Sequence, residues 1–365
     1  MIQKIKASFR QDTILTVSLF LACLSCLIIH PDSQYIHYID FNTMILLFCL
    51  MLIVQGLKEQ DFFQEIGERI LSKVKTERGI IFTLVSLCFF SSMFITNDVA
   101  LITFIPFGLL ILEMIHLSSM LCITITLMTI AANLGSMLTP IGNPQNLYLF
   151  SISEYSLQEF LLLTLPYTLA SAILLFIVIF IRYKKNQIDI QLQKQRKKVK
   201  RQVYEYLLLF FLCLLSVAGV IPRAILLGII TVCIWLKDGR LFLKIDYALL
   251  LTFVCFFIFI GNMNRMEGLH ELIIHMIEKQ ERMISIGISQ IISNVPAALL
   301  LSGYTDNIKE LIIGTNIGGL GTLIASMASL ISYKQVAMKY PQQKRRYLLT
   351  FTCWNVIFLI ILCLL

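Results

Sequence analysis

Long apolar runs separated by short polar segments dominate the chain. Several runs, such as Thr13 to Ile29, Phe160 to Ile181 and Tyr347 to Leu365, approach the roughly 20 residues that an α-helix needs to cross a bilayer. The alternating polar and apolar pattern of a membrane β-barrel is absent from the sequence, and lipid admits only helices or closed barrels as spanning structures. The pattern therefore predicts an all-α, polytopic membrane protein.

The same pattern predicts about nine spanning helices and two re-entrant hairpins. The hairpins are expected at 79–115 and 283–303, each preceded by an amphipathic stretch, at 58–78 and 264–282. Two full crossings are an alternative for the first hairpin, whereas each half of the second has only about ten residues and is too short to cross. The predicted spans lie near 13–30, 42–57, 117–150, 160–181, 203–220, 223–237, 246–262, 308–332 and 347–365.

Composition and charge favour a membrane setting over nucleic acid binding. Only 14% of the 365 residues are charged, against roughly 25% in a soluble domain. The net charge of +8 comes from basic residues in short loops between apolar runs. With a cytoplasmic N-terminus, 25 of the 30 lysines and arginines fall on the cytoplasmic side, as the positive-inside rule expects. We therefore expect a multi-pass protein of a prokaryotic plasma (inner) membrane, in contact with lipid and with no nucleic acid partner.

Two halves of the chain share one order of motifs. Asp40 and Asp246 each precede an apolar run, and an amphipathic stretch, a hairpin with a central asparagine, a glycine-interrupted segment and a plain span follow. In the predicted topology Asp40 lies outside and Asp246 inside, so the halves have opposite sense. We predict inverted repeats at 1–181 and 223–365, with a basic cytoplasmic linker and a connecting span at 182–222. The alternative is that apolar helices resemble one another by composition.

Two segments, 131–146 and 314–322, combine glycine with polar side chains at membrane depth. A helix broken there leaves backbone groups unpaired, and these must face protein or a water-filled cavity. The N–H groups at a half-helix N-terminus suit an anion, and unwound carbonyls suit Na⁺. A kinked helix or a surface loop is the alternative for the first segment, and close small-residue packing for the second. We assign four polar residues of the breaks to substrate binding: Asn133, Thr139, Asn143 and Asn316.

Asp98 is the only acidic residue that falls deep inside a predicted membrane segment. A carboxylate at mid-bilayer costs on the order of 2.5–3.5 kcal/mol on insertion scales, so such a residue usually marks function. We expect Asp98 either to bind a coupling cation or to carry a proton. The alternative is that residues 96–98 form an outer turn between two full spans, with Asp98 capping the following helix.

Four stretches together resemble the ion transporter superfamily, which includes arsenite permeases, NhaD-type sodium–proton antiporters, citrate carriers and divalent-anion/sodium symporters. The tips Thr96-Asn97-Asp98 and Ser293-Asn294-Val295-Pro296 are closer to the arsenite and sodium–proton branches than to the dicarboxylate symporters. The likeness covers nearly the whole chain. It is carried by residues 95–100, 135–146, 293–298 and 318–322.

The resemblance implies that each hairpin tip faces the broken helix that follows it. Substrate and Na⁺ or H⁺ would bind between them, and an elevator-like movement would expose the site to each side in turn. Asp98 joins the first cation site on account of its position. The implied first cation site is Ser92, Thr96, Asn97, Gly135 and Ser136, its partner is Ser293, Asn294, Gly318 and Gly319, and Asn146 and Thr322 lie near the substrate.

We therefore predict a secondary active transporter of a small anion, a carboxylate or an inorganic oxyanion such as arsenite, coupled to Na⁺ or H⁺. A Na⁺/H⁺ antiporter that uses the same site is the alternative. We do not expect an enzyme, because no intramembrane nucleophile with a base is recognisable. The five histidines form no metal-ligand spacing, so we expect no cofactor beyond the coupling ion, with Na⁺ a candidate at the cation-binding residues. A homodimer is the assembly that we consider.

Overall fold

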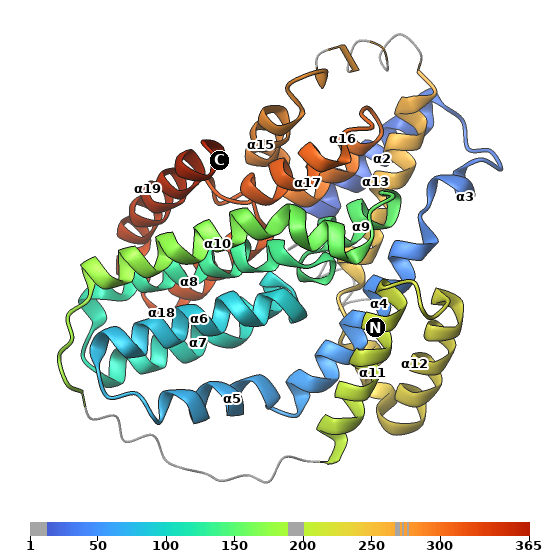
Figure 1. The fold of residues 1–365 in the computed structure, drawn as a ribbon. Helices are drawn as coiled ribbons and strands as arrows, with labels where there is room; N and C mark the ends of the chain where they lie inside the picture. The colour runs from blue at the N-terminus through green and yellow to red at the C-terminus, as the bar shows by residue number, and fades with distance from the viewer. Residues whose placement is uncertain (1–12, 189–200, 267–270, 272–273, 276) are drawn as a thin grey trace.

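The computed structural model describes residues 13–188, 201–266, 271, 274–275 and 277–365, and it is helical almost throughout (Figure 1). Segment 1–12, most of the predicted basic linker and part of the predicted amphipathic stretch 264–282 lie outside the described residues. Within the described ranges, seven helices are long and apolar enough to cross a membrane. The prediction of an all-α, polytopic membrane protein is confirmed.

The first half of the chain alternates apolar helices with short turns. Apolar α2 and α4 are joined through the short α3, amphipathic α5 leads into the pair α6 and α7, and the broken segment from α8 to α9 leads into α10. The bounds are α2 (Thr13–Ile28), α3 (Tyr35–Tyr38), α4 (Phe41–Glu59), α5 (Phe62–Leu71), α6 (Glu77–Ile95), α7 (Asn97–Met114), α8 (Leu121–Gly135), α9 (Pro144–Ile152) and α10 (Leu157–Arg182), with 3₁₀ turns at Ser118–Met120, Ser136–Leu138 and Pro140–Gly142.

The second half repeats this order after two connecting helices. Apolar α13 precedes the pair α15 and α16, the broken segment runs from α17 to α18, and α19 ends the fold. The bounds are α11 (Arg201–Val217), α12 (Arg223–Asp238), α13 (Tyr247–Asn264), α15 (Glu281–Ile292), α16 (Asn294–Ser302), α17 (Ile308–Ile317), α18 (Met327–Lys339) and α19 (Lys344–Cys363), with 3₁₀ turns at Gly239–Leu243 and Pro341–Gln343.

One predicted loop is largely a helix. We expected residues 333–346 to form a cytoplasmic loop, but α18 continues to Lys339. The reason is a helical spacing of small and apolar residues, since Ala328, Ser332 and Val336 follow one another at four-residue intervals and are all buried. The last turn of α18 is anchored where the Lys339 ammonium meets the Glu113 carboxylate at the end of α7, at 2.7 Å.

The two hairpins differ in length but share one turn geometry. With 19 and 18 residues, α6 and α7 are long enough for the alternative of two full crossings, whereas α15 and α16 have 12 and 9 residues. Each pair turns at a single non-glycine residue of positive φ, Thr96 (φ 70°, ψ 151°) and Ser293 (φ 78°, ψ 154°). Such backbone costs about 1–3 kcal/mol and persists only where its surroundings hold it.

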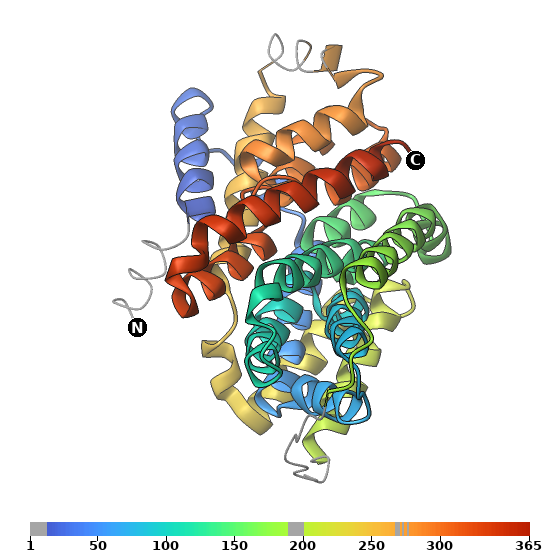
Figure 2. The same cartoon turned by 90° about the vertical axis from the view of Figure 1, so that its left-hand side faces the viewer.

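The helices pack as two groups. The framework group consists of α2, α4, α11, α12 and α13, in which α4 packs on α11 and α12 and α13 packs on α2 (Figure 1). In the hairpin group, α6 and α7 pack on α8, α15 and α16 pack on α17, and α19 lies across α8 and α10 (Figure 2). The two groups meet mainly where α9 packs on α4 and α16 on α13.

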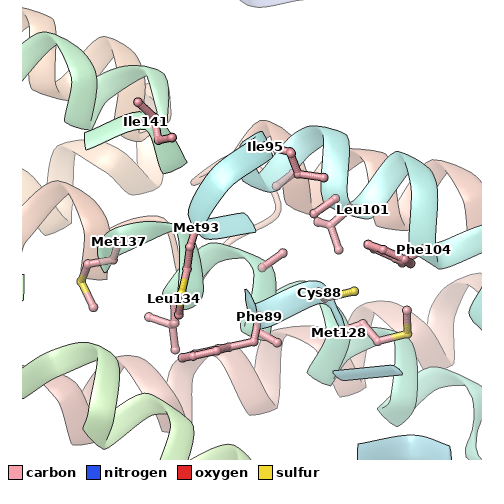
Figure 3. Close-up of a cluster of buried hydrophobic side chains, with 14 of the residues drawn as sticks. Cys88, Phe89, Met93, Ile95, Leu101, Phe104, Met128, Leu134, Met137 and Ile141 are labelled. Carbon is pink, nitrogen blue, oxygen red and sulfur yellow. The ribbon is translucent and has the colours of Figure 1, made fainter. Parts of the chain in front are cut away.

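Helix α8 has no face left for lipid. All of its residues are buried, because the first hairpin, α10, α18 and α19 enclose it. Figure 3 shows the apolar seam that joins α8 and the turns after it to the first hairpin. The labelled side chains of this seam are Cys88, Phe89, Met93, Ile95, Leu101, Phe104, Met128, Leu134, Met137 and Ile141.

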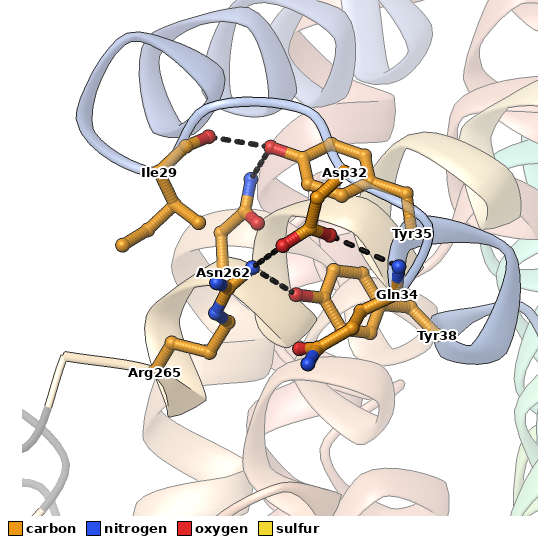
Figure 4. Close-up of polar contacts among 7 residues, drawn as sticks. All are labelled: Ile29, Asp32, Gln34, Tyr35, Tyr38, Asn262 and Arg265. Atoms are coloured by element: carbon orange, nitrogen blue, oxygen red, sulfur yellow. Dashed lines mark hydrogen bonds and ion pairs between the residues drawn. The ribbon is translucent and has the colours of Figure 1, made fainter.

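A polar cluster ties the loop after α2 to the end of α13 (Figure 4). The Arg265 guanidinium donates to the Asp32 carboxylate at 2.8 Å and to the Tyr38 hydroxyl at 3.1 Å. The buried amide of Asn262 donates to the Tyr35 hydroxyl at 2.8 Å. These contacts fix α3 against α13, within the framework group.

Two framework glycines each accommodate a tyrosine ring. A Cβ atom added at Gly261 would lie 2.3 Å from the ring of Tyr38, and one at Gly56 would lie 2.3 Å from the ring of Tyr206. We predict that Gly261→Ala lowers the free energy of unfolding by about 1–3 kcal/mol, the usual cost of overpacking. Thermal unfolding of the purified protein in detergent measures the effect. Gly228→Ala in α12 is the matched control, since its Cβ would meet nothing within 4 Å; equal midpoints for the two variants would contradict the packing argument.

Candidate functional site

The two hairpin tips contact the breaks of their own halves. Asn97 begins α7 and Asn294 begins α16, and each is 4% exposed. The Asn97 side-chain amide donates to Oδ1 of Asn133 at 3.0 Å, and the backbone N–H of Asn294 donates to the carbonyl oxygen of Ala325 at 3.0 Å. The structure thus brings the first tip onto the last turns of α8 and the second tip onto the irregular backbone that follows α17.

A glycine at each break lets a hairpin helix approach closely. A Cβ atom on Gly135 would lie 2.1 Å from the Phe89 carbonyl oxygen and 2.8 Å from Oγ of Ser92. A Cβ atom on Gly318 would lie 2.8 Å from Oγ of Ser289. Both serines stand four residues before the positive-φ residue of their hairpin. We predicted Ser92 but missed Ser289, although this shared offset from the tip was a usable signal.

Asn133 joins the first break to the second. Its Oδ1 accepts hydrogen bonds from the Asn97 amide and from the Ser326 hydroxyl, both at 3.0 Å. Its Nδ2 is 3.4 Å from the carbonyl oxygen of Gly319. The side chain is 3% exposed, so none of these contacts competes with bulk water. Asn133 therefore holds one tip and both breaks together.

Asn316 makes the reciprocal contact. Like Asn133, it stands two residues before a glycine of its break, and it is 2% exposed. Its Nδ2 donates to Oδ1 of Asn146 at 2.6 Å and to the Ile312 carbonyl oxygen at 2.7 Å. Its Oδ1 accepts from Nδ2 of Asn143 at 3.3 Å. Each break thus sends one asparagine into the other half of the chain.

The helices that follow the breaks also pack against the opposite half of the chain. Helix α9 packs on α16 and α17, and α18 packs on α7 and α8. The Tyr148 hydroxyl of α9 is 2.8 Å from Oγ of Ser302 in α16, and the Thr129 hydroxyl of α8 donates to Oγ of Ser332 in α18 at 2.7 Å. The contacts of one half are therefore repeated by the other, while the opposite membrane sense of the two halves stays a prediction.

The carbonyls of the first break are satisfied by Asn146. Its Nδ2 is 3.4 Å from the carbonyl oxygen of Ser136 and 3.3 Å from those of Met137 and Thr139. The Thr139 hydroxyl donates to the Met93 carbonyl oxygen on the first hairpin. Three predicted residues, Ser136, Thr139 and Asn146, therefore lie together, where the first turn of α9 meets the irregular backbone that follows α8.

The carbonyls of the second break are satisfied by a residue that we did not predict. Nε2 of Gln290, on α15, donates to the carbonyl oxygens of Gly318 and Leu320, both at 2.9 Å. Its Oε1 accepts from the backbone N–H of Thr322 at 2.9 Å, and Thr322 itself is exposed. Gln290 was missed because it belongs to neither a tip nor a break, and a lone glutamine on a helix gives no sequence signal.

Asp98 is the polar residue with the least satisfied side chain at the first tip. Its backbone N–H donates to Oδ1 of Asn97 at 2.9 Å. Its own Oδ1 is buried and has no hydrogen-bond partner in the part of the chain that the structure describes. An unpaired buried carboxylate oxygen is costly, and a cation or a proton would relieve that cost.

Two further polar atoms are buried at the start of α9. Oδ1 of Asn143 and Nε2 of Gln145 have no hydrogen-bond partner among the described residues, and the two side chains are 2% and 1% exposed. We predicted Asn143 but not Gln145. An apolar cavity of about 490 Å³ lies elsewhere, between α5, α6 and α11, and none of the predicted site residues lines it.

We predict that Asn133→Leu lowers the free energy of unfolding by about 3 kcal/mol, because each buried polar group left without a partner costs ~1–3 kcal/mol. The Asn97 amide and the Ser326 hydroxyl would both lose their acceptor. Asn355→Leu is the matched control, since Asn355 is also fully buried but its amide donates only to Phe351 in its own helix. Chemical or thermal unfolding of both variants tests this, and equal losses would argue against the link between halves.

Comparison with known proteins agrees with this architecture. Residues 12–310 match the family described as citrate transporter (CitMHS). The chain is 35% identical over 319 residues to an uncharacterized transporter of Methanocaldococcus jannaschii, covering 87% of each protein, and 28% identical over 299 residues to the inner membrane protein YbiR of Escherichia coli, covering 81% of this chain and 80% of the relative. It is 29% identical over 160 residues to the silicon efflux transporter LSI3 of Oryza sativa subsp. japonica, covering 44% of this chain and 32% of the relative. The predicted resemblance is confirmed, and the chain belongs to the citrate transporter family.

Proposed function

We propose that the protein is a secondary active transporter that moves a small anion across a prokaryotic plasma membrane, coupled to Na⁺ or H⁺. The observation that carries the proposal is the meeting of two broken helices, cross-linked by Asn133 and Asn316, beside the unpaired carboxylate oxygen of Asp98. Irregular backbone at membrane depth is tolerated where it is enclosed by protein or lines a cavity, and in secondary transporters it forms the substrate site.

The start of α9 supports an anion as the substrate. Nε2 of Gln145 is a buried donor without a partner among the described residues, and an anion supplies the acceptor that it lacks. Among the described residues, neither α9 nor α18 has a side-chain cap at its N-terminus, so the positive end of each helix dipole favours a negative charge nearby. A carboxylate or a small oxyacid anion fits these donors. The rice relative, named for silicon efflux, supports the oxyacid class.

Asp98 supports coupling to a cation. Its buried Oδ1 has no hydrogen-bond partner among the described residues, so a Na⁺ ion or a proton held at Asp98 offsets the cost of burying it. The other predicted ligands of this site are Ser92, Thr96, Asn97, Gly135 and Ser136. Asn97 contacts Asp98, and Gly135 packs closely against Ser92, which supports a shared site. Because the bound cation offsets the charge of the anion nearby, each ion increases the affinity for the other, and this reciprocity links their movements.

The packing supports alternating access by movement of the hairpin group against the framework group. Contacts between the groups run mainly through α9 on α4 and α16 on α13. At the first of these, the Ser151 hydroxyl donates to the Asp40 carboxylate at 2.7 Å. The amphipathic α5 joins α4 of the framework to α6 of the first hairpin, which suits a helix that lies along the membrane surface while the hairpin group moves.

A Na⁺/H⁺ antiporter is the second candidate. The unpaired oxygen of Asp98 favours it, since one buried acid can hold Na⁺ and H⁺ in turn. Vesicles with a pH-sensitive dye in the lumen separate the two functions. Alkalinisation driven by a Na⁺ gradient with no transported anion present supports the antiporter, whereas a requirement for citrate, arsenite or silicate supports anion transport.

Replacing Asp98 should abolish coupling. We predict that Asp98→Asn lowers gradient-driven uptake into proteoliposomes by about tenfold or more, the effect of losing ~1.4 kcal/mol of cation binding. The variant should still insert, because asparagine keeps the shape and removes a buried charge. Asp306→Asn is the control, since Asp306 is exposed in the loop before α17. Wild-type coupled uptake by Asp98→Asn would refute the coupling role.

Replacing Gln145 should act on the anion alone. Gln145→Glu puts a carboxylate where the unpaired donor stands, so we predict that the KM for the transported anion rises by about tenfold, or ~1.4 kcal/mol. The KM for the coupling cation, measured at saturating anion, should be unaffected. An unchanged KM in Gln145→Glu would remove this residue from the substrate site.

A further inference from the structure

We propose that the side-chain amide of Gln290 takes the place of a second coupling cation, so that the transporter moves its substrate with a single cation bound in the first half. The proposal rests on the proposed function and specifies its stoichiometry. It starts from a difference between the two halves, which share their backbone contacts but not their chemistry.

The carbonyl oxygens of the second break already have donors. An unwound helix in a transporter offers carbonyl oxygens that can coordinate Na⁺. Here those of Gly318 and Leu320 each accept a hydrogen bond of 2.9 Å from Nε2 of Gln290. A primary amide has two N–H groups, so both can be used at once. The amide and a cation would need the same lone pairs, and one therefore excludes the other.

The amide of Gln290 is held in one orientation. Oε1 accepts from the Thr322 backbone N–H at 2.9 Å, and the Thr322 hydroxyl donates to the backbone oxygen of Gln290 at 3.1 Å. A flipped amide would point its oxygen at two carbonyl oxygens. Gly321 has φ 103°, and a Cβ atom there would lie 2.2 Å from Oε1 of Gln290. The second break is therefore shaped around this side chain.

The second tip also lacks the charge of the first. Val295 stands where the first tip has Asp98, one residue after the asparagine that begins the helix. The first hairpin in turn has Met93 three residues before its turn, where the second has Gln290, and a thioether cannot donate a hydrogen bond. The first half thus has a carboxylate after its tip asparagine and no glutamine before the turn, and the second half has the glutamine and no carboxylate.

The amide of Asn146 does not occupy the carbonyl oxygens of the first break in the same way. Its Nδ2 is 3.3–3.4 Å from three carbonyl oxygens of the break, and its Oδ1 accepts from Asn316. Nε2 of Gln290 makes two shorter contacts of 2.9 Å to its break, besides one of 3.2 Å to the Ile286 carbonyl oxygen in its own helix. Asn146 also lies in α9, beyond the break, whereas Gln290 lies in the hairpin helix itself. The unpaired oxygen of Asp98 remains available to a cation in the first half.

Gln290→Glu tests the proposal by exchanging the donor for a carboxylate between the two carbonyl oxygens. The thermal midpoint of the purified variant should rise when NaCl is added, compared with choline chloride at equal ionic strength. The wild type should show a smaller rise or none. In proteoliposomes the Hill coefficient for the coupling cation should be about 1 in the wild type and should approach 2 in Gln290→Glu when Na⁺ is supplied. Gln280→Glu, the same change at an exposed position before α15, should behave as the wild type.

Two results would overturn the inference. A wild-type Hill coefficient near 2 would show a second cation, and this measurement needs no variant to fold. If a folded Gln290→Glu protein shows no larger rise in thermal midpoint with NaCl than the wild type, the amide occupies no latent cation site. The thermal experiment requires no transport, so its outcome does not depend on the proposed function. If the proposed function is wrong, the wild type will show no gradient-driven anion flux.

Discussion

The fold depends on satisfying broken backbone inside a membrane, where no water is available to do it. Both breaks meet this constraint with side-chain amides. Asn146 and Gln290 donate to the freed carbonyl oxygens, and Asn133 and Asn316 bridge from each break to the opposite half. Because these bridges are reciprocal, neither broken helix is complete without the other. The meeting of the two halves is therefore what permits interrupted helices in this protein.

The two halves share their backbone geometry but differ in the functional side chains that they carry. Both hairpins turn at a non-glycine residue of positive φ, and both set a serine against a glycine of the break. The charged residue Asp98 belongs to the first half alone, and the closing glutamine Gln290 to the second. In the mechanism that we propose, the pseudo-symmetric frame allows alternating access, while the unequal residues within it decide which ions are carried and how many.

The sequence alone predicted the helical membrane fold, the tips and the breaks, because each leaves a local mark: long apolar runs, Asn97 and Asn294 in apolar surroundings, and glycine beside polar residues. It did not predict Gln290, Ser289 or Gln145, since their importance comes from contacts between segments far apart in the chain. The continuation of α18 beyond the predicted span, from Tyr333 to Lys339, was also missed. Its polar residues suggested a loop, but burial of one face against α7 and α8 outweighed that signal.

The complete enclosure of α8 has a consequence for biogenesis. Part of the cover around this helix comes from α18 and α19, which are translated well after α8. Until they arrive, the Asn133 side chain of a nascent chain cannot reach Ser326 in the other half. Until then, the first half lacks the contacts that α18 and α19 make with α8. The cover of α8 is therefore complete only after α18 and α19 have been translated.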